Sequence, residues 1–336
     1  MIIEAIDLLQ RNIDLSSAQM HQVMEEIMRG EAFTPQIVSF LTALNKKGET
    51  VDEITAGVEV MRKFATRICI DKEVVLDTCG TGGDKKGTFN VSTAVAFVAA
   101  GSGITVAKHG NRSVSSRCGS ADILEALGVK IDLTVDKIEM CLNKIGLAFL
   151  FAQNLHPAMK YAMPARKEIS AKTVFNILGP LSNPAQATHQ LVGVYDCKLT
   201  QLLAEVLLKL GTKSALVVCG KDGLDEVTTT DETFISELKL GKIKNYEISP
   251  EDFGLKRSRL EDLSGGSAEE NAKVLIDILK SAPGPKRDIV ILNSAAAIYA
   301  AGKVDSIKDG IKIASVSIDS GAALNKLELL KEFSRE

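Results

Sequence analysis

The turn at residues 77–84, which reads Asp-Thr-Cys-Gly-Thr-Gly-Gly-Asp, constrains the fold of this chain more than any other feature. A short apolar run precedes it and another, at 94–98, follows, which predicts a strand, a glycine-rich turn and a helix. The glycines let the backbone adopt positive φ and bring several N–H groups to one anion. Asn90 or Ser92 is expected to cap the helix, whose positive end then faces that anion. The pattern predicts a site for a phosphate-bearing ligand.

Two better-known phosphate-binding motifs do not fit this turn. In the dinucleotide fingerprint G-x-G-x-x-G, Lys85 occupies the position of the third glycine. In a P-loop that begins at Gly82, Thr88 stands where lysine is required. The turn ends in Asp84, which would repel a bare phosphate but can hold sugar hydroxyls, so the sequence favours a ligand that carries both. Taken alone, the turn is equally compatible with an ordinary flexible connection.

A second loop, at residues 108–117, crowds three cations, a histidine, an amide and three hydroxyls between a strand-like run at 104–107 and a helical stretch at 123–127. Lysine and arginine offer charge-assisted donors to phosphate. Charge runs are usually solvated surface loops, but the glycines, hydroxyls and strand-to-helix setting favour an anion site here. Both loops follow consecutive strands, at the edge where open α/β sheets bind ligands.

These loops belong to a set of motifs that extends over essentially the whole chain. The motifs lie at 80–84, 90–93, 108–116, 119–122, 152–153, 156–160, 175–181, 183–184, 225–226, 293–302 and 317–321. Together they resemble the anthranilate phosphoribosyltransferases, a family similar in fold to the pyrimidine nucleoside phosphorylases.

The resemblance implies an α/β fold with a small helical domain and a larger α/β domain around a mainly parallel central sheet. We expect the helical domain at residues 1–70, completed by part of 155–185, and the α/β domain at 71–336. The block at 154–183 interrupts the alternation of strands and helices. The active site is expected in the cleft between the domains, where closure can exclude water.

The implied reaction transfers the 5-phosphoribosyl group from 5-phosphoribosyl 1-diphosphate (PRPP) to the amine of anthranilate. The products are N-(5-phosphoribosyl)anthranilate and pyrophosphate, in tryptophan biosynthesis. Mg²⁺ is the implied cofactor, with two ions bridged by the diphosphate. No covalent intermediate is needed, and the sequence offers no convincing activated nucleophile.

Site residues follow from matching positions. The PRPP site is expected to comprise Gly80, Gly83, Asp84, Thr88, Asn90, Val91, Ser92, Thr93, Lys108, His109, Gly110, Asn111, Arg112, Ser113, Val114, Ser115, Ser116 and Ser120. The anthranilate site is expected to comprise Gly80, Asn111 and Arg166, with His109 near the aromatic ring. The metal ligands are expected to be Ser92, Asp225 and Glu226. Without the resemblance, the acidic pair reads as a solvated turn and Arg166 as an exposed helix arginine.

One segment departs from the family pattern. After Arg166 the family usually has Leu-Gly-x-Arg-Thr, whereas this chain has Ser170 and Lys172 in place of the glycine and the second arginine. Losing the glycine would alter a turn, and lysine does not reproduce a bidentate arginine contact. The family pattern therefore does not predict the details of the hinge on the anthranilate side.

Composition excludes several other classes of protein. The 336 residues suffice for two domains, and the net charge of −3 gives no electrostatic footprint for nucleic acid. No apolar run approaches membrane-span length. The N-terminal residues lack a basic region, so no signal peptide is expected. The six cysteines form no C-x-x-C pair and are expected to be reduced thiols in the cytoplasm. The family adds an expected homodimer and a possible association with anthranilate synthase.

Start and stop signals predict the elements. Residues 1–66 read as four helices, with Thr34-Pro35 and Gly48 bounding one and a Thr50-x-x-Glu53 capping box opening the next. Further predictions are strands at 191–195 and 215–219, a hairpin at 233–248 turning near Gly241, and helices at 199–210, 268–281, 290–301 and, interrupted or bent, 307–332.

Two rival functions stay open at this point. A pyrimidine nucleoside phosphorylase would share the fold and use free phosphate with a nucleoside, although Asn111, Arg166 and the acidic pair oppose it. A non-catalytic nucleic-acid-binding relative would need a basic surface and would leave the glycine-rich and acidic motifs unexplained.

Overall fold

Four helices form the N-terminal part of the chain, as predicted. The structure is a computed structural model that describes residues 1–113 and 118–336. The first helices are α1 (Ile2–Gln10), α2 (Ser17–Arg29), α3 (Thr34–Lys47) and α4 (Val51–Phe64). The predicted capping box is confirmed, because Glu53 N donates to Thr50 Oγ1 at 3.2 Å and Thr50 N donates to Glu53 Oε2 at 2.8 Å. Gly48 ends α3 at φ 88°, but Phe33 rather than Thr34 is the N-cap residue of that helix.

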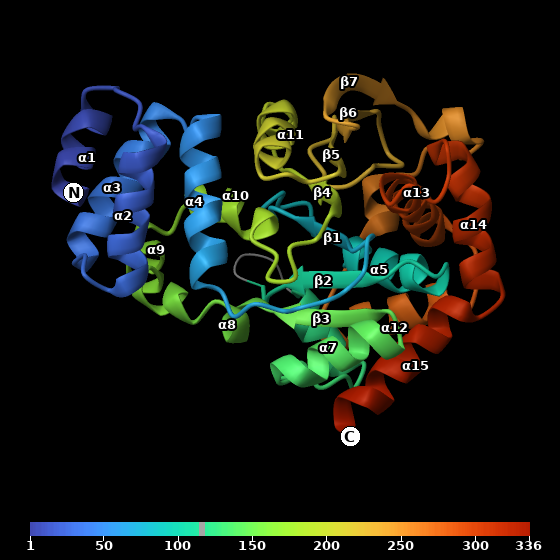
Figure 1. The fold of residues 1–336 in the computed structure, drawn as a ribbon. Coiled ribbons are helices and arrows are strands. Elements are labelled where there is room, and N and C mark those ends of the chain that lie inside the picture. The colour runs from blue at the N-terminus through green and yellow to red at the C-terminus, as the bar shows by residue number, and fades with distance from the viewer. Residues whose placement is uncertain (114–117) are drawn as a thin grey trace.

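A later segment returns to these helices. It contains α8 (Ala152–Leu155), the 3-10 helix η1 (Pro157–Tyr161), α9 (Met163–Ile169) and α10 (Val174–Leu181). Helix α9 packs on α3 and α10 packs on α4. Buried side chains from both segments, among them Phe40, Ile54 and Leu178, share one core. The helical domain in Figure 1 is therefore built from two separate parts of the chain.

The larger domain is built around a seven-stranded sheet of order β3-β2-β1-β4-β5-β6-β7. The strands are β1 (Leu76–Gly80), β2 (Val106–Gly110), β3 (Leu147–Phe151), β4 (His189–Gly193), β5 (Ser214–Gly220), β6 (Thr233–Lys239) and β7 (Lys242–Ile248). Strands β1 to β5 are parallel to one another, whereas the pairs β5–β6 and β6–β7 are antiparallel. The predicted mainly parallel sheet is confirmed, as is the hairpin that turns at Gly241.

Both faces of the sheet are covered, which explains its apolar strands. Along β4 and β5, successive side chains point to opposite faces. Leu191 and Leu216 enter the core shared with α5 (Val91–Gly101), whereas Val192 and Val217 enter the core shared with the helical domain. On this second face α11 (Leu199–Lys209) lies between the sheet and α4 (Figure 1).

The remaining helices complete the outer layer. They are α6 (Ser120–Ala126), α7 (Val135–Lys144), α12 (Ala268–Leu279), α13 (Pro285–Ala300), α14 (Ile307–Asp319) and α15 (Ala322–Arg335), with short 3-10 helices η2 (Pro250–Phe253) and η3 (Leu260–Leu263). The predicted interruption in 307–332 is real, because Gly321 adopts φ 77° between α14 and α15. The sequence reading did not identify α7 or β3, and it placed the start of α13 five residues late.

Two of the cysteines correct the expectation of six reduced thiols. Cys197 and Cys219 form a disulfide that joins the loop after β4 to the end of β5. Cys69, Cys79, Cys118 and Cys141 are free thiols. The two bonded residues are 22 positions apart, so no local sequence motif announces the pair; the parallel pairing of β4 with β5 brings them together.

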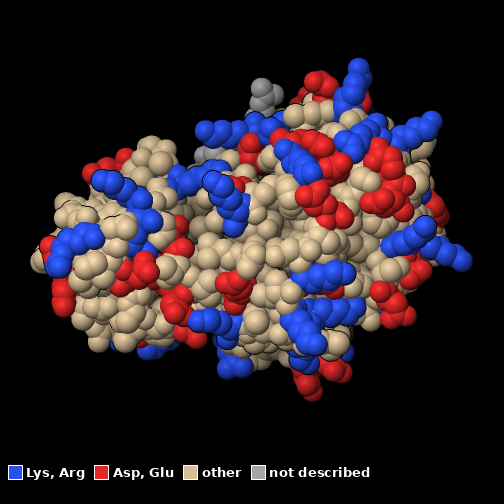
Figure 2. All heavy atoms as spheres, turned by 90° about the horizontal axis from the view of Figure 1, so that it is seen from above, with Lys and Arg blue, Asp and Glu red and all other residues tan. Residues whose placement is uncertain are grey.

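The surface has no single dominant charge on the face shown in Figure 2, where acidic and basic side chains are interspersed. In the described ranges, no helix is long and apolar enough to cross a membrane.

Candidate active site

The candidate site lies at the carboxyl ends of β1, β2, β4 and β5, which meet at one edge of the sheet. Strand β1 is central: β2 and β3 lie on one side of it, and β4 and β5 lie on the other. This reversal of strand order is the point at which open α/β sheets bind ligands. The glycine-rich turn begins within β1, the basic segment begins with Lys108 within β2, and the acidic pair follows β5.

The glycine-rich loop is fastened to the acidic loop. Gly82 N donates to Asp225 Oδ2 at 2.9 Å. A Cβ on Gly80 would lie 2.8 Å from the same carboxylate oxygen, so a side chain at this position would have to displace the Asp225 carboxylate. Gly82 and Gly83 adopt φ of 62° and 75°, the left-handed region that glycine enters readily. The turn is thus shaped by its contact with Asp225, and the two expected site segments are brought together.

The predicted helix cap is wrong in its detail. Asn90 is the N-cap residue of α5, but its side chain makes no cap hydrogen bond. Its Nδ2 instead donates to the carbonyl of Cys118 at 3.1 Å, which joins the first loop to the second. Ser92 lies inside the helix, with Oγ accepting from Lys108 Nζ at 3.2 Å. Asn90 Oδ1 and Thr93 Oγ1 are buried and have no hydrogen-bond partner among the described residues.

Lys108 is buried at 3% exposure beneath this edge. Its Nζ donates to the carbonyl of Thr78 at 2.6 Å, besides the contact with Ser92. Burial lowers the pKa of Lys108, and the negative charge of Asp77 opposes that shift. Its ammonium also lowers the pKa of Glu226, although burial dominates there. Lys108 therefore supports the site from the protein interior, by its hydrogen bonds to Thr78 and Ser92 and by its charge near Glu226.

Asp225 and Glu226 are partly accessible side chains on the loop after β5. Burial raises the pKa of Asp225 to about 6, and the charge of Asp84 adds to the rise. Burial also raises the pKa of Glu226 well above its ordinary value, with a further contribution from Asp225. Burial likewise raises the pKa of Asp84. Three carboxyl groups thus repel one another at the site, and a cation would relieve that repulsion.

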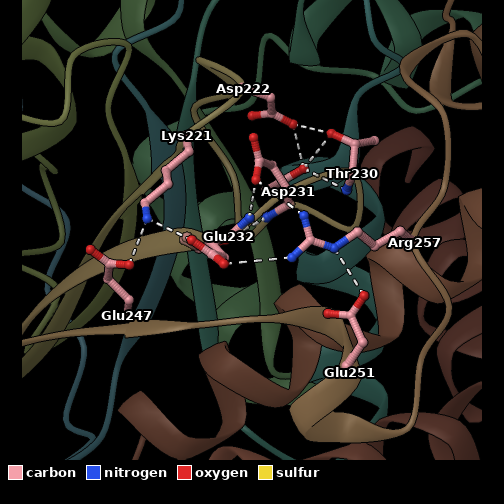
Figure 3. A network of polar contacts seen from close by, with 10 residues as sticks. Lys221, Asp222, Thr230, Asp231, Glu232, Glu247, Glu251 and Arg257 are labelled. Atoms are coloured by element: carbon pink, nitrogen blue, oxygen red, sulfur yellow. Dashed lines mark hydrogen bonds and ion pairs between the residues drawn. The ribbon is translucent and has the colours of Figure 1, made fainter.

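A polar network holds the loop that carries this acidic pair (Figure 3). Asp222 accepts from the Leu224 backbone N at 3.0 Å and from Thr228 Oγ1 at 2.6 Å, and it also accepts from Thr230 Oγ1. Lys221 bridges Glu232 and Glu247 at 2.5 and 2.7 Å. Arg257 bridges Asp231, Glu232 and Glu251. The loop is therefore braced by the polar contacts of Asp222, Lys221 and Arg257.

The donor set fits Mg²⁺. In the described parts of the chain, no three His, Cys, Asp or Glu side chains cluster in a way that could hold a metal. Mg²⁺ rarely uses such a cage; it is usually held by one or two carboxylates together with waters and substrate phosphates. Asp225 and Glu226 supply two carboxylates with raised pKa, and Ser92 lies in the same region, since its backbone N–H is close enough to Glu226 to lower the pKa of that carboxyl.

Arg166, expected to hold the anthranilate carboxylate, lies on α9. Its guanidinium carbon lies 5.5 Å from the centroid of the Phe175 ring. Burial lowers the pKa of Arg166, and the guanidinium forms no ion pair with any described residue. It is a half-buried cation with a planar fork free for a carboxylate.

Asn111 and two histidines lie on the β2 and α8 side. Asn111 Oδ1 accepts from Gln153 Nε2 at 3.2 Å. The rings of His109 and His156 are 5.1 Å apart, centroid to centroid. Burial lowers the pKa of His156 to about 4 and the pKa of His109 well below its ordinary value. Both rings are neutral at pH 7, and their Nε2 atoms have no hydrogen-bond partner among the described residues.

The other residues expected in the site lie in different surroundings. Thr88 pairs with Ser264, and Ser120 opens α6 beside Gly110, where a Cβ would lie 3.2 Å from Ser120 Cβ. Arg112 points to its own domain, where it forms ion pairs with Asp122 at 3.0 Å and Glu125 at 2.5 Å. Ser113 N donates to Asp122, and Val91 is buried in the core. Val114, Ser115 and Ser116 lie outside the described residues.

Sequence reasoning missed two polar anchors of the site. Asp77 accepts from His109 N at 3.1 Å and from Asn183 Nδ2 at 2.8 Å, which ties β1, β2 and the loop after α10 together. Burial raises the pKa of Asp77 to about 6. A single acid after the apolar residues 74–76 was the available signal, because a buried acid needs partners. The second anchor, Lys172, lies against Gly83 and Tyr195, and no spacing in the sequence links these positions.

Comparisons with known proteins show which family this chain is similar to. The family model of the glycosyl transferase family a/b domain matches residues 72–324, and that of the helical bundle domain matches residues 3–65. The chain is 52% identical to the anthranilate phosphoribosyltransferase of Petrotoga mobilis, covering 96% of this chain and 93% of that protein. It is 51% identical to that of Alkaliphilus metalliredigens, covering 100% and 99%.

Solved structures show the same likeness. The crystal structure of anthranilate phosphoribosyltransferase from Thermus thermophilus has a TM-score of 0.93 and 40% identity, covering 99% of both chains. The enzyme from Saccharomyces cerevisiae in complex with PRPP and Mg has a TM-score of 0.92 and 27% identity, covering 99% of this chain and 98% of that one.

Proposed function

This chain belongs to the anthranilate phosphoribosyltransferases of the glycosyl transferase family, and from that premise we propose that the edge formed by β1, β2, β4 and β5 is its active site. The chain is a transferase that moves the 5-phosphoribosyl group of PRPP to the amine of anthranilate. The observation that carries the site assignment is the hydrogen bond from Gly82 N to Asp225, which joins the glycine-rich turn to the acidic pair at the reversal of strand order.

The chemistry needs charge stabilisation at two places. The bond between C1 of ribose and the diphosphate oxygen breaks, and its electron pair leaves with pyrophosphate. The lone pair of the anthranilate amine forms the new C1–N bond, and the nitrogen then loses a proton. Positive charge develops on the ribose ring and negative charge on the leaving group, so fixed donors around the diphosphate lower the barrier. A covalent intermediate on the protein is not part of this scheme.

The glycine-rich loop is the proposed cradle for PRPP. The N–H groups of Thr81 and Gly82 already donate to Gly193 O and Asp225, so the N–H groups that follow them in the turn are proposed to donate to the diphosphate, and Asp84 to accept from ribose hydroxyls. Ser92, Asp225 and Glu226 would hold Mg²⁺, which neutralises diphosphate charge when bound. Two ions are proposed, and the relative in complex with PRPP and Mg supports the use of this metal.

Anthranilate is proposed to bind between Arg166 and Asn111. The Arg166 guanidinium offers two parallel donors to the carboxylate, and the Asn111 amide orients the amine. The neutral rings of His109 and His156 provide a wall for the aromatic ring. His109 is a positioning residue here, because burial lowers its pKa and keeps its ring neutral.

The proposal extends to the molecule's setting. We expect a cytoplasmic enzyme that works as a homodimer and can associate with anthranilate synthase. Mixed surface charge on the face in Figure 2 supports no role for nucleic acid.

Anthranilate fluorescence tests the function directly. We expect it to fall when enzyme, PRPP and Mg²⁺ are all present, and to stay constant when any one is omitted. Activity that needs inorganic phosphate and a nucleoside instead would replace this proposal with a nucleoside phosphorylase.

The metal site has its own test. In Asp225→Asn combined with Glu226→Gln, we expect the Mg²⁺ concentration for half-maximal activity to rise and the rate to fall, because the variant lacks both charges. Asp305→Asn, an exposed acid outside the polar network that holds the acidic loop, is the control. An unchanged Mg²⁺ titration in the double variant would remove these residues from the metal site.

A further inference from the structure

Lys172 connects the helical domain to the glycine-rich loop. It lies between α9 and α10, which pack on α3 and α4, so its backbone belongs to the helical domain. Its side chain reaches the other domain, where a Cβ on Gly83 would lie 2.9 Å from Lys172 Cε and 3.4 Å from Nζ. The side chain thus lies directly against the turn proposed to bind PRPP, rather than on the anthranilate side.

The backbone before Lys172 keeps the turn that the family's glycine would favour, although Ser170 replaces that glycine. Ser170 ends α9 in the left-handed region, at φ 51° and ψ 22°. Its Oγ donates to the carbonyl of Lys167 at 2.8 Å, which helps to hold a conformation that costs a non-glycine residue about 1 kcal/mol. The departure from the family pattern therefore changes the residues and preserves the direction of the chain toward Gly83.

The ammonium of Lys172 rests on an aromatic ring. Nζ lies 3.1 Å from the ring centroid of Tyr195, a cation–π contact. Tyr195 is itself joined to the glycine-rich loop, because its backbone N donates to Thr81 Oγ1 at 3.2 Å. The ring places the ammonium beside the loop without occupying its three hydrogen-bond donors.

Acidic residues lie near Lys172, but none of those described forms an ion pair with it. Its ammonium is attracted by Asp225, Asp84 and Asp196 and repelled by Lys85, and burial is the largest effect, lowering its pKa. No carboxylate of the described residues lies within ion-pair distance of Nζ, and no hydrogen bond of Nζ to these residues is present. A compact ammonium with free donors at a phosphate site is a binding group for phosphate oxygens.

We infer that Lys172 binds the diphosphate group of PRPP from the side of the helical domain, an inference that rests on the proposed function. Mg²⁺ held by Asp225 would offset the attraction of that carboxylate for the ammonium, and the diphosphate would supply oxygens for the free donors of Nζ. The leaving group is then held by the turn of one domain and the lysine of the other. The contact strengthens as the C1–O electron pair moves onto the diphosphate, so it favours the transition state.

Pyrophosphate is the probe, because it is the diphosphate alone. With Mg²⁺ present, we expect Lys172→Met to weaken pyrophosphate binding, measured by calorimetry, by about 10- to 100-fold, the range of one charge-assisted contact. The KM for PRPP should rise and kcat should fall, whereas the KM for anthranilate should change less than about 2-fold. Lys172→Arg, which restores the usual family residue, should keep most of the pyrophosphate affinity.

Two controls separate binding from structural support. Lys144→Met removes another lysine that lies over an aromatic ring, Phe333, far from the site, and should leave all constants unchanged. Tyr195→Leu removes the resting contact while keeping the charge, and should retain pyrophosphate affinity within about 3-fold. If Tyr195→Leu weakens pyrophosphate as much as Lys172→Met does, Lys172 only supports the loop and the inference is wrong.

The remaining outcomes are equally decisive. Unchanged pyrophosphate affinity in a folded Lys172→Met protein overturns the inference; Lys172→Gln serves if the methionine variant does not fold. The proposed function fails separately, when the unmodified chain consumes no anthranilate. The pyrophosphate titration still reports on Lys172 in that case.

Discussion

At the scale of single residues, Asp225 makes stability depend on pH. Its pKa is about 6 in the folded state, raised by burial and by Asp84 from an ordinary value of 3.8. Between these two values the folded state binds more protons than the unfolded state. The free energy of unfolding therefore falls as the pH rises through this window, and the loss is complete above about pH 6.

Asp225→Asn should remove that loss. The amide oxygen still accepts from Gly82 N, while the uncompensated charge disappears. We expect the metal-free variant to be more stable than the unmodified chain at about pH 7.5 by about 1–3 kcal/mol, and to show a smaller fall between about pH 4.5 and 7.5. Urea unfolding across this range measures it, with exposed Asp305→Asn as the control. Parallel curves for both proteins would contradict the raised pKa, and saturating Mg²⁺ should shrink the advantage, because the ion binds only the carboxylate.

Arg166 should discriminate between the two substrates. Replacing it with alanine removes the two-donor contact proposed for the anthranilate carboxylate, so we expect the KM for anthranilate to rise by about 10-fold or more. The KM for PRPP should change little, because the phosphate loops lie on other elements. Lys167→Ala changes the neighbouring exposed cation on α9 and is the matched control. Equal increases in both KM values would show that Arg166 supports the whole cleft instead.

At the scale of elements, the end of β4 fixes the acidic loop. A Cβ on Gly193 would overlap the backbone carbonyl of Asp225, and Gly193 O accepts from Thr81 N at 2.9 Å. Gly193→Ala should therefore displace the loop that carries Asp225, lower the free energy of unfolding by about 1–3 kcal/mol and weaken Mg²⁺ dependence. Thermal unfolding and a Mg²⁺ titration of activity measure the two effects.

Gly211→Ala is the contrasting variant. Gly211 has φ 79° and no atom within 4 Å of an added Cβ, so its replacement strains only the backbone. We expect a loss of about 1 kcal/mol with normal activity. If Gly193→Ala behaves in the same way, the packing of β4 on the acidic loop does not hold the metal site in place.

The elements also show what the sequence could predict. Local signals located the N-terminal helices, because Gly48 and the box of Thr50 and Glu53 act within one turn of chain. The parallel sheet followed from alternation, and the two loops proposed to bind phosphate were singled out by residue types between strand and helix. Strand β3 was missed because its five apolar residues have no polar alternation, being buried on both faces.

Contacts between distant segments were beyond local signals. The Asp77–Asn183 pair spans 106 residues, and the approach of Gly82 to Asp225 spans 143. The motif match placed both segments near the ligand but did not indicate that they touch. The Cys197–Cys219 bond belongs to the same group, since it depends on the pairing of β4 with β5. The sequence pattern assigned Lys172 to the anthranilate side, as a lysine that does not reproduce an arginine contact there. Its contact with Gly83 was not predicted, because no spacing in the sequence links the two positions.

At the scale of the whole molecule, the exposed apolar side chains concern assembly. Ile3 on α1 is 68% exposed, and Phe33 at the start of α3 is 74% exposed. Helices α1 and α3 pack together, so both side chains belong to the helical domain. Large exposed apolar side chains on one domain favour a protein partner, and a second copy of the chain agrees with the proposed homodimer.

Phe33→Asp should weaken that dimer, because it places a charge where apolar surface would be buried. We expect the unmodified chain to sediment at twice its 36.0 kDa mass and the variant to shift toward the monomer at micromolar concentration. Leu240→Asp is the matched control: Leu240 is 88% exposed in the β6–β7 turn of the other domain, where its φ of 52° suits aspartate. If both variants sediment like the unmodified chain, the dimer does not use the start of α3. If the unmodified chain is itself monomeric and active, the two domains of one chain suffice for the reaction. That outcome agrees with the position of Lys172, which belongs to one domain and contacts the glycine-rich loop of the other.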